Sequence, residues 1–387
     1  MQQPPKVILL LPSAREFDRG LRRGIFKYAH DYGPWIFGEV PAPYLKQLTT
    51  SQRKRQFRKW NADGAIALED RLPEVGPLRV PTIAVNARRQ LDRTHCRLVS
   101  DDDAIGQMGA KTILDLGIRR AAYCGLPDQE FSDIRGLSFA RTIIQTGYPV
   151  EVYLLPDRNT RISWQTEERR LTRWLHELPK PVGLMTCNDD RARMIAEICH
   201  VQGIRVPDEI AILGVDNDEQ VCKSATPPLS SIELAVERAG YEAAKTLARM
   251  MSGDGPGTEC ILVDPVGVVC RQSTDILAIE DRTMVQAVRF IREHCNRSIQ
   301  VRDVAAFVGL SRRALQDRFR QSFGRTPIQE IHRSRIERLQ RMLIETSLTV
   351  GQIAESNGFE VGAHVARFFV RQTGMTPLAY RKKYLRP

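Results

Sequence analysis

The sequence predicts an α/β part, in which parallel sheets are flanked by helices, followed by an all-α domain with two helix-turn-helix motifs. Three observations predict this fold class. Short apolar runs alternate with helical stretches through residues 1–275. The positive charge is concentrated in the last part of the chain, and a helical motif occurs there twice. A chain of 387 residues is long enough for roughly two or three domains.

The α/β part is predicted from apolar runs bounded by Gly, Pro, Asn or Asp, with helical periodicity between them. We expect strands at Val7–Leu11, Ala65–Leu68, Thr82–Val85, Ala121–Gly125, Val150–Leu155, Val182–Thr186 and Ile210–Val215. We expect helices at Phe17–His30, Ile105–Leu116, Glu167–Leu178, Asp190–Gln202 and Ala235–Met251. Alternation of this kind is typical of parallel sheets with helices on both faces.

Composition excludes several classes of protein. Hydrophobic residues make up 42% and charged residues 27%, which is typical of a folded chain rather than a disordered one. No apolar run is long enough to span a bilayer, and Val7–Leu11 is too short for a signal-peptide core. The eight cysteines form no C-x-x-C pair, so we expect mostly buried thiols in a cytoplasmic protein without metal, cofactor or membrane segment.

The charge is distributed unevenly along the chain. Residues 282–387 contain 20 Lys and Arg against 8 Asp and Glu, whereas residues 1–281 contain 37 against 38. Of those 20 cations 18 are Arg, whose guanidinium group matches phosphate oxygens and guanine edges. A basic module fused to a neutral one indicates a nucleic-acid binder with an attached sensor, and a well-solvated helical surface is the alternative.

Polar residues follow several predicted strands, where doubly wound sheets bind their ligands. Asp and Asn side chains suit vicinal hydroxyl groups, and the face of Trp164, expected in the loop 161–165, suits a sugar ring. For any single residue, helix capping or burial in the core remains the alternative. The candidate ligand-binding residues are Asp18, Arg135, Trp164, Asp189, Arg191, Asp216 and Asn217.

Residues 1–275 also resemble the sensor domain of the LacI/GalR repressors, which is similar to periplasmic sugar-binding proteins. The matching motifs are Val99-Ser100-Asp101-Asp102, Leu116-Gly117, Asn188-Asp189-x-x-Ala192, Gly214-Val215-Asp216-Asn217, Leu229-Ser230-Ser231-Ile232 and Arg271-x-Ser273-Thr274. The resemblance implies a two-lobed, periplasmic-binding-protein-like sensor. It implies that Arg135, Asp189 and Asp216 bind sugar hydroxyls and that Trp164 stacks on the ring. LacI-type chains begin with a DNA-binding headpiece, whereas a sensor strand begins here at Val7, so we expect DNA binding at the other end.

A first helix-turn-helix motif is predicted after residue 281. Asp281 is expected to cap a helix whose buried face is formed by Met284, Ala287, Val288 and Ile291. A second helix with Val301, Val304, Ala305 and Val308 ends at Gly309, and Ser311 caps a third with Leu315, Phe319 and Phe323 inside. The outward residues of this third helix are candidate base readers, because Arg suits guanine, Gln adenine and Asp cytosine. They are Arg312, Arg313, Gln316, Asp317 and Arg320.

The motif then repeats. The residues Leu315, Phe319, Gly324, Thr326 and Pro327 recur as Val365, Phe369, Gly374, Thr376 and Pro377. The helix Ile328–Ile344 is expected to join the two units and, at about 1.5 Å per residue, to span roughly 25 Å. That length suits two recognition helices in successive major grooves of DNA.

This end of the chain resembles the AraC/XylS DNA-binding domain. The matching residues are Ile353-Ala354, Gly358-Phe359, Arg367-Phe368-Phe369-Val370-Arg371, Gly374-Met375-Thr376-Pro377 and Tyr380-Arg381. The resemblance implies that Arg313, Gln316 and Asp317 read bases in the first unit and Arg367 in the second, where His364 and Arg371 are further candidates. Gly362, Ala363 and Val365 depart from the family pattern, so the second unit is expected to act partly through shape and phosphate contacts. For Arg318 and Arg371, phosphate contact or intramolecular pairing is favoured over base contact.

Together these patterns predict residues 1–275 as a sugar-sensing domain, 276–283 as a linker and 284–387 as the DNA-binding domain. The chain as a whole resembles regulators with this order of domains. This resemblance implies that it is a transcription activator of pentose genes. The implied partners are a double-stranded DNA operator, a monosaccharide effector (D-xylose first), RNA polymerase and a second copy of the chain. The alternatives are a different sugar effector or a sugar-binding transport protein. A sugar-processing enzyme is disfavoured, because G-x-S-x-G, P-loop, G-x-G-x-x-G and H-E-x-x-H motifs are absent from the sequence.

Overall fold

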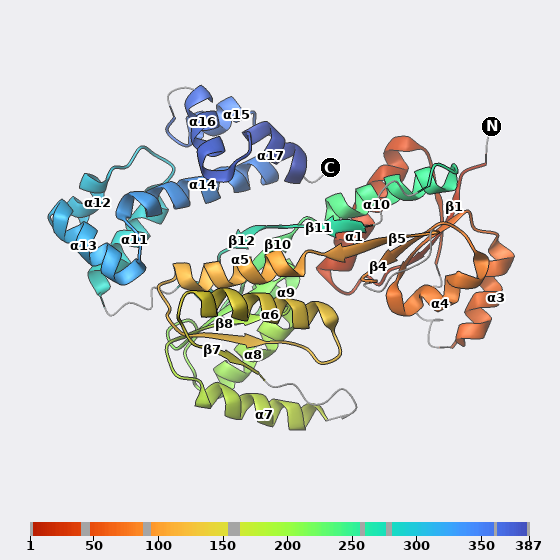
Figure 1. The fold of residues 1–387 in the computed structure, drawn as a ribbon, viewed down its shortest axis with the longest axis horizontal. Coiled ribbons are helices and arrows are strands. Elements are labelled where there is room, and N and C mark those ends of the chain that lie inside the picture. The colour runs from red at the N-terminus through yellow and green to blue at the C-terminus, as the bar shows by residue number, and fades with distance from the viewer. Residues whose placement is uncertain are drawn as a thin grey trace. The chain divides into compact units, whose positions relative to one another are not determined.

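The computed structural model describes residues 3–39, 47–87, 94–153, 163–255, 260–275, 281–359 and 362–384. The chain divides into two compact units (Figure 1). Unit 1 consists of Met1–Asp101 and Leu234–Pro265, and unit 2 of Asp102–Glu233 and Val266–Arg386. Both contain a six-stranded sheet, and the helical domain belongs to unit 2.

The sheet of unit 1 has the strand order β11-β5-β4-β3-β1-β2, with parallel pairing between the neighbouring strands. Its strands are β1 (Lys6–Leu10), β2 (Ile36–Gly38), β3 (Gly64–Leu68), β4 (Thr82–Val85), β5 (His95–Ser100) and β11 (Cys260–Val263). Its helices are α1 (Glu16–Tyr32), α3 (Thr50–Trp60), α4 (Leu72–Val75) and α10 (Val236–Met251). The central strands are apolar and fully buried, as continuous Val, Ile, Leu and Ala runs predict.

Helices α1 and α10 pack with their backbones almost touching. A Cβ atom on Gly24 would lie 1.9 Å from the Glu237 carbonyl oxygen, and one on Gly240 would lie 2.1 Å from that of Leu21. Glycine is required at both positions because any side chain would separate the helices. An ion pair of 3.2 Å between Arg23 and Glu237 lies beside this contact.

The sheet of unit 2 has the order β12-β10-β9-β8-β6-β7. Its strands are β6 (Ala121–Cys124), β7 (Val150–Val152), β8 (Val182–Thr186), β9 (Ile210–Val215), β10 (Ser230–Leu234) and β12 (Pro265–Val269). The helices around it are α5 (Asp102–Asp115), α6 (Glu130–Gln145), α7 (Trp164–Glu177), α8 (Asp189–Val201) and α9 (Glu219–Ser224). Helices α5 and α6 also approach closely, since a Cβ on Gly106 would lie 2.5 Å from the Arg135 carbonyl oxygen.

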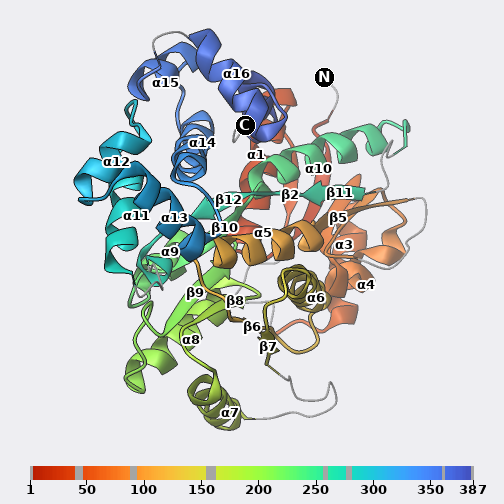
Figure 2. The ribbon, with the colours of Figure 1, turned by 60° about the vertical axis from the view of Figure 1, so that its left-hand side comes forward.

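The helical domain follows as α11 (Arg282–His294), α12 (Val301–Phe307), α13 (Arg312–Phe323), α14 (Pro327–Glu345), α15 (Val350–Ser356), α16 (Gly362–Thr373) and α17 (Pro377–Tyr384). It has two apolar clusters, and α14, which is labelled in Figure 2, contributes residues to both. Ile331 packs with α11, α12 and α13, whereas Leu339 and Leu343 pack with α15, α16 and α17. One long helix therefore connects two small helical cores, as the sequence predicts.

The two helix-turn-helix units repeat the same turn. Gly309 has a φ of 69° and Gly358 a φ of 67°, values that favour glycine. In each unit the amide after this glycine donates to a carbonyl five residues back, that of Ala305 at 2.9 Å and that of Ala354 at 3.0 Å. The repeat predicted from the sequence therefore extends in the backbone to the turns at Gly309 and Gly358.

The predicted α/β and helical fold classes are confirmed, with small shifts at element ends. Strands β4, β8 and β9 have the predicted bounds, and Asp281 and Ser311 cap α11 and α13 as expected. The placement of Trp164 in a loop is wrong: Ser163 accepts a hydrogen bond from the Thr166 amide and starts α7 at Trp164. The predicted end of the strand at Leu155 lies outside the described residues.

Two further observations bear on the composition. Of the eight cysteines, all free thiols, Cys260 is half-buried, Cys270 is exposed and the other six are buried. Across the described ranges, each helix is too short or too polar to cross a membrane.

Candidate functional site

The parallel strands β6, β8 and β9 bring their carboxyl ends to one edge of the unit 2 sheet. Asp189 begins α8 directly after β8, and Asp216 directly follows β9. Arg135 is carried to them by α6, the helix that follows β6. Three of the predicted ligand residues thus lie together, at the position where sheets of this type bind ligands.

Arg135 is the best-anchored side chain of this edge. Its Nε donates to Asp102 Oδ1 at 2.7 Å, and its Nη1 donates to the Cys187 carbonyl oxygen at 2.5 Å. The same Nη1 lies 4.0 Å from Asp216 Oδ1, and the side chain is 3% exposed. A buried guanidinium held on two sides keeps a fixed direction, which suits recognition of a polar ligand.

Asp189 is committed to protein groups. Its carboxylate accepts hydrogen bonds from Ser231 Oγ at 2.6 Å and from the Asp218 amide at 2.7 Å. Burial, and next the negative charge of Asp216, raise the pKa of Asp189 well above its usual value. The carboxyl group lies against Gly214, where a Cβ would be 2.1 Å from Asp189 Oδ1. Asp189 therefore holds the turn after β9 in place.

That turn contains Asp216 and Asn217, whose φ values are 102° and 49°. Positive φ is unusual for residues with a side chain, particularly at 102°, and such strain is often found at functional sites. The Asn217 amide donates to Ser231 Oγ at 3.0 Å, and its Oδ1 accepts from Arg271 Nη2 at 2.7 Å. The side chain of Asn217 is thus oriented by Arg271.

Arg191 contacts a different set of side chains from this cluster, and Trp164 lies at the surface. Arg191 is buried, donates to Glu167 Oε1 at 2.7 Å and to Cys124 Sγ at 3.2 Å, and lies over the ring of Tyr153. Trp164 is 53% exposed at the first turn of α7. An exposed indole is available for stacking, whereas Arg191 is held in a polar network of its own.

Asp18 belongs to unit 1, in the first turn of α1 after β1. Its side chain is buried, and this burial raises its pKa to about 6, although Arg15, Arg19 and Arg22 act in the opposite direction. A carboxyl group with such a pKa changes charge in mildly acidic solution.

The edge of unit 2 offers fixed donors and acceptors for hydroxyl groups. The guanidinium of Arg135 is a donor, and the carboxylate of Asp216 is an acceptor beside it. Among the residues that the structure describes, no group of three or more His, Cys, Asp or Glu side chains is arranged to hold a metal ion.

Sequence reasoning missed the residues that position this edge. Asp102, Asp218, Ser231 and Arg271 make the contacts that orient the predicted ligand residues. Three of them lie in motifs that carry the LacI/GalR resemblance, which is the signal that pointed to them. Their partners are 14 to 54 residues away in sequence, so spacing alone does not reveal the pairs.

The second candidate site is the outward face of α13. Leu315, Phe319 and Phe323 are buried on its inner side. The predicted readers occupy the opposite side, and all five are exposed: Arg312, Arg313, Gln316, Asp317 and Arg320. Within the described ranges these five side chains form no ion pair, so the face is open to an external partner.

Arg318 differs from its neighbours on α13. It makes a two-point contact with Asp281, through Nε at 2.7 Å and Nη2 at 2.5 Å, and so fixes α13 to the start of α11. This is the intramolecular pairing that the sequence favoured. In α16, His364, Arg367 and Arg371 are exposed, whereas Val365 and Phe369 are buried.

Comparison with known proteins matches both parts of the chain. Residues 110–274 match the periplasmic binding protein-like domain, and residues 304–383 match a helix-turn-helix domain. The chain is similar to the xylose operon regulatory protein of Escherichia coli strain K12, with 28% identity over 97% of this chain and 96% of that protein. It is also similar to the xylose operon regulatory protein of Haemophilus influenzae, with 28% identity over 98% and 99% of the two chains.

Solved structures give the same result. The structure of a xylose-binding transcription activator has a TM-score of 0.61 and 26% identity, and the match covers 99% of both chains. A transcriptional regulator in complex with cellobiose covers 70% of this chain and 86% of its own, with a TM-score of 0.54 and 15% identity, and shows the fold alone. Two α/β lobes of periplasmic-binding-protein type and a helix-turn-helix domain are thus present in one chain.

Proposed function

We propose that this chain is a sequence-specific DNA-binding transcription regulator whose α/β part binds a monosaccharide, with D-xylose as the first candidate. The observation that carries the proposal is the similarity to xylose operon regulatory proteins along nearly the whole chain, which covers the sensor and the DNA-binding part together. A transport protein of the same sensor fold would not account for the basic helical part.

The residues that we propose to bind the sugar are Asp18, Arg135, Trp164, Asp189, Arg191, Asp216 and Asn217. Within unit 2, Arg135 and Asp216 are the pair we expect to contact hydroxyl groups directly, because they combine a fixed donor with a neighbouring acceptor. Asp189 supports them by holding the Asp218 amide. Sugar binding at this edge would shift the equilibrium between two states of the sensor only to the extent that the sugar binds one state more tightly than the other.

The proposed DNA contacts are Arg312, Arg313, Gln316, Asp317 and Arg320 in α13, and His364, Arg367 and Arg371 in α16. The two recognition helices are joined by α14, whose 19 residues span about 28 Å at 1.5 Å per residue. This length supports binding in successive major grooves. We propose residues 1–275, 276–283 and 284–387 as sensor, linker and DNA-binding domain. We further propose a cytoplasmic homodimer that activates pentose genes with RNA polymerase and has no catalytic activity.

The sugar proposal is tested by calorimetry on the full chain with D-xylose, L-arabinose and D-glucose. We expect D-xylose to bind and Asp216→Ala to abolish binding. Asp208→Ala is the matched control, because it removes an acidic side chain of unit 2 that is 66% exposed and lies 3.7 Å from Arg205 in an ion pair. No binding of any of the three sugars would refute the sensor role, and normal binding by Asp216→Ala would refute the site.

The DNA proposal is tested by fluorescence anisotropy with a duplex selected by the wild-type chain from a random pool. Arg313→Ala should weaken specific binding by about 1–3 kcal/mol. Arg289→Ala removes the same charge from the exposed face of α11 and should leave the preference for the selected sequence unchanged. Binding of wild type that does not weaken with salt, or an unchanged affinity of Arg313→Ala for the selected duplex, would contradict the proposal.

A further inference from the structure

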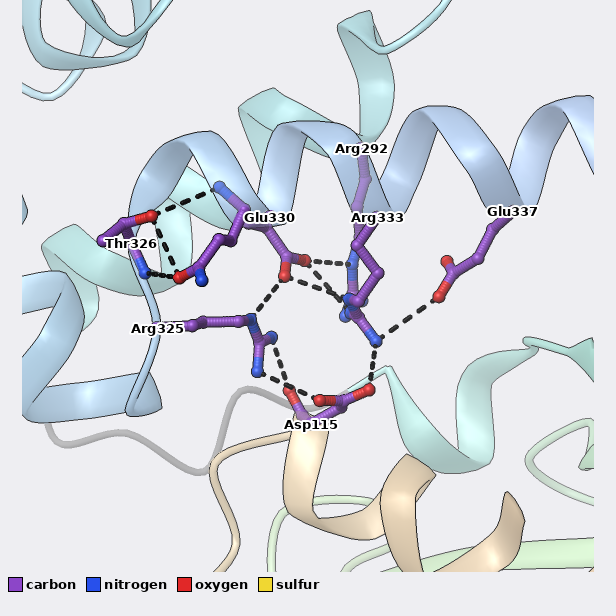
Figure 3. Close-up of polar contacts among 8 residues, drawn as sticks. Asp115, Arg292, Arg325, Thr326, Glu330, Arg333 and Glu337 are labelled. Atoms are coloured by element: carbon purple, nitrogen blue, oxygen red, sulfur yellow. Dashed lines mark hydrogen bonds and ion pairs between the residues drawn. The ribbon is translucent and has the colours of Figure 1, made fainter. Parts of the chain in front are cut away.

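Helix α5 begins and ends with an aspartate, and each pairs with arginine in a different part of unit 2. Asp102 at its start accepts from Arg135 Nε at 2.7 Å, at the candidate sugar site. Asp115 at its end accepts from Arg333 Nη1 at 2.9 Å and lies 3.3 Å from Arg325 Nη1 (Figure 3). Both of these arginines belong to the helical domain. One helix therefore makes charged pairs with the candidate sugar site at its start and with the helical domain at its end.

The arginines that meet Asp115 are held in place from their own side. Glu330 of α14 is fully buried, and it accepts from Arg325 Nε at 2.7 Å and from Arg333 Nη2 at 3.1 Å (Figure 3). Burial alone would raise the pKa of Glu330, but Arg333 and Arg325 lower it below its usual value. Glu337 lies 3.4 Å from Arg333 on the other side. The guanidinium groups are thus oriented toward α5 independently of Asp115.

The position of Asp115 is unfavourable for α5 itself. A carboxylate in the last turn of a helix faces the negative end of the helix dipole, where Lys and Arg are preferred. The two arginines of the helical domain supply the compensating charge. A local cost of this kind is expected where a residue serves a contact outside its own helix.

The contact extends to the first recognition helix. After α5, Arg119 Nη2 donates to the Gln321 carbonyl oxygen at 3.1 Å, in the last turn of α13. Arg325 also donates to the Asp115 carbonyl oxygen at 2.8 Å, just before α14 begins. The end of α5 is therefore bound to the first helix-turn-helix unit at both ends of the α13–α14 connection.

Helix α5 is suited to transmit displacement along its axis. Its 14 residues span about 21 Å at 1.5 Å per residue. It is packed against α6 at Gly106, and Ser138 Oγ donates to the Asp103 carbonyl oxygen at 2.7 Å. Because packed helices shift as units rather than deform continuously, we expect a displacement of Asp102 to move Asp115 as well.

We propose that Asp115, Arg325, Arg333 and Glu330 form a joint, here called the α5 joint, through which helix α5 couples the sugar site to the first helix-turn-helix unit. The inference rests on the proposed function and names its route of regulation. A purely structural ion pair would contribute to stability but would leave the effect of sugar on DNA binding unchanged. The two roles therefore predict different measurements.

The experiment uses the full chain, the selected DNA duplex and D-xylose. The measured quantity is the ratio of the Kd for DNA without and with saturating sugar. We expect a wild-type ratio that differs from 1 by about 5-fold or more, in the range typical of coupled sites. Asp115→Asn should bring the ratio at least threefold closer to 1, while the Kd for D-xylose in the absence of DNA changes less than about threefold. Asp115→Glu, which keeps the charge, should retain part of the ratio.

Glu197→Gln is the matched control, because it removes an exposed ion pair with Arg193 within α8 and should keep the wild-type ratio. Should Asp115→Asn fail to fold, Arg325→Gln removes one partner while the pair of Arg333 and Glu330 remains. An unchanged ratio in the folded variant, or a wild-type ratio of 1 with both ligands bound, would overturn the α5 joint. Absence of sugar or DNA binding in wild type would instead refute the proposed function, on which the α5 joint depends.

Discussion

Gly214 is the position at which one added methyl group tests the geometry of the candidate sugar site. In Gly214→Ala the new Cβ would lie 2.1 Å from Asp189 Oδ1, whereas ordinary contacts at such a carbon begin at 3.4 Å. The backbone of β9 is paired on both sides and cannot retreat freely. The carboxyl group must therefore move by about 1.3 Å, the difference between these two distances.

The loss of stability in Gly214→Ala can be worked out from the hydrogen bonds that the Asp189 carboxyl group accepts. Its bonds from Ser231 at 2.6 Å and from the Asp218 amide at 2.7 Å would be stretched past hydrogen-bond range. Loss of such a bond costs about 0.5–3 kcal/mol, depending on charge, and overpacking of a core costs about 1–3 kcal/mol. We expect Gly214→Ala to lower the free energy of unfolding by about 2–4 kcal/mol on these grounds.

Urea unfolding followed by tryptophan fluorescence measures this change, and calorimetry with D-xylose measures binding. The matched control is Gly267→Ala in β12, where no atom lies within 4 Å of the added Cβ. We expect the control to stay within about 0.5 kcal/mol of wild type. If Gly214→Ala is as stable as Gly267→Ala and binds sugar equally well, the close contact between Gly214 and Asp189 does not exist in solution.

Three further predictions concern charged side chains. Because burial raises the pKa of Asp18 to about 6, its contribution favours folding below its unfolded pKa and is lost as the pH rises through 6. Asp18→Asn should therefore gain up to about 3 kcal/mol relative to wild type between pH 4 and pH 7 in urea titrations, and a pH-independent difference would contradict this. Glu330→Gln should lower the free energy of unfolding by about 1.5–3 kcal/mol, because the half-buried Arg325 and Arg333 lose their charged hydrogen bonds to Glu330 and keep those to Asp115. A loss below about 0.5 kcal/mol in the same assay would show that Glu330 is not paired as described. Arg318→Gln should lower the free energy of unfolding by about 0.5–1 kcal/mol, because its half-exposed ion pair with Asp281 is lost. Arg313→Gln should leave the free energy of unfolding unchanged and should weaken DNA binding. The opposite pattern would show that the two arginines have exchanged roles.

Much of the fold could be predicted because buried parallel strands are continuous apolar runs. Strands β4, β8 and β9 consist of such runs and have the expected bounds. The edge strand β7 was predicted, whereas the edge strands β2, β11 and β12 were missed. β2 has three residues, and β12 is only half-buried throughout, so neither produces a continuous buried run. Edge strands are specified by pairing with a neighbour rather than by their own apolar pattern.

The candidate site could be predicted only as a set of residues. Asp189 is predicted to bind sugar, and the sequence did not show that its carboxylate accepts a hydrogen bond from Ser231, which is 42 residues away. Trp164 was expected in a loop, because the capping role of Ser163 was not recognised. Which side chains bind a ligand and which hold the others in place depends on contacts between distant segments, and local sequence does not contain them.

Unit 1 is assembled from two stretches of chain that are separated by residues 102–233. During synthesis, α1 and β5 therefore emerge long before α10 and β11, which cover them. At roughly 5–20 residues per second, these 132 residues delay completion of unit 1 by about 7–26 seconds. Through that interval β5 lacks its outer neighbour β11, and α10 does not yet cover the surface of α1 around Gly24. Nascent chains that stop before α10 would thus be ready substrates for quality control.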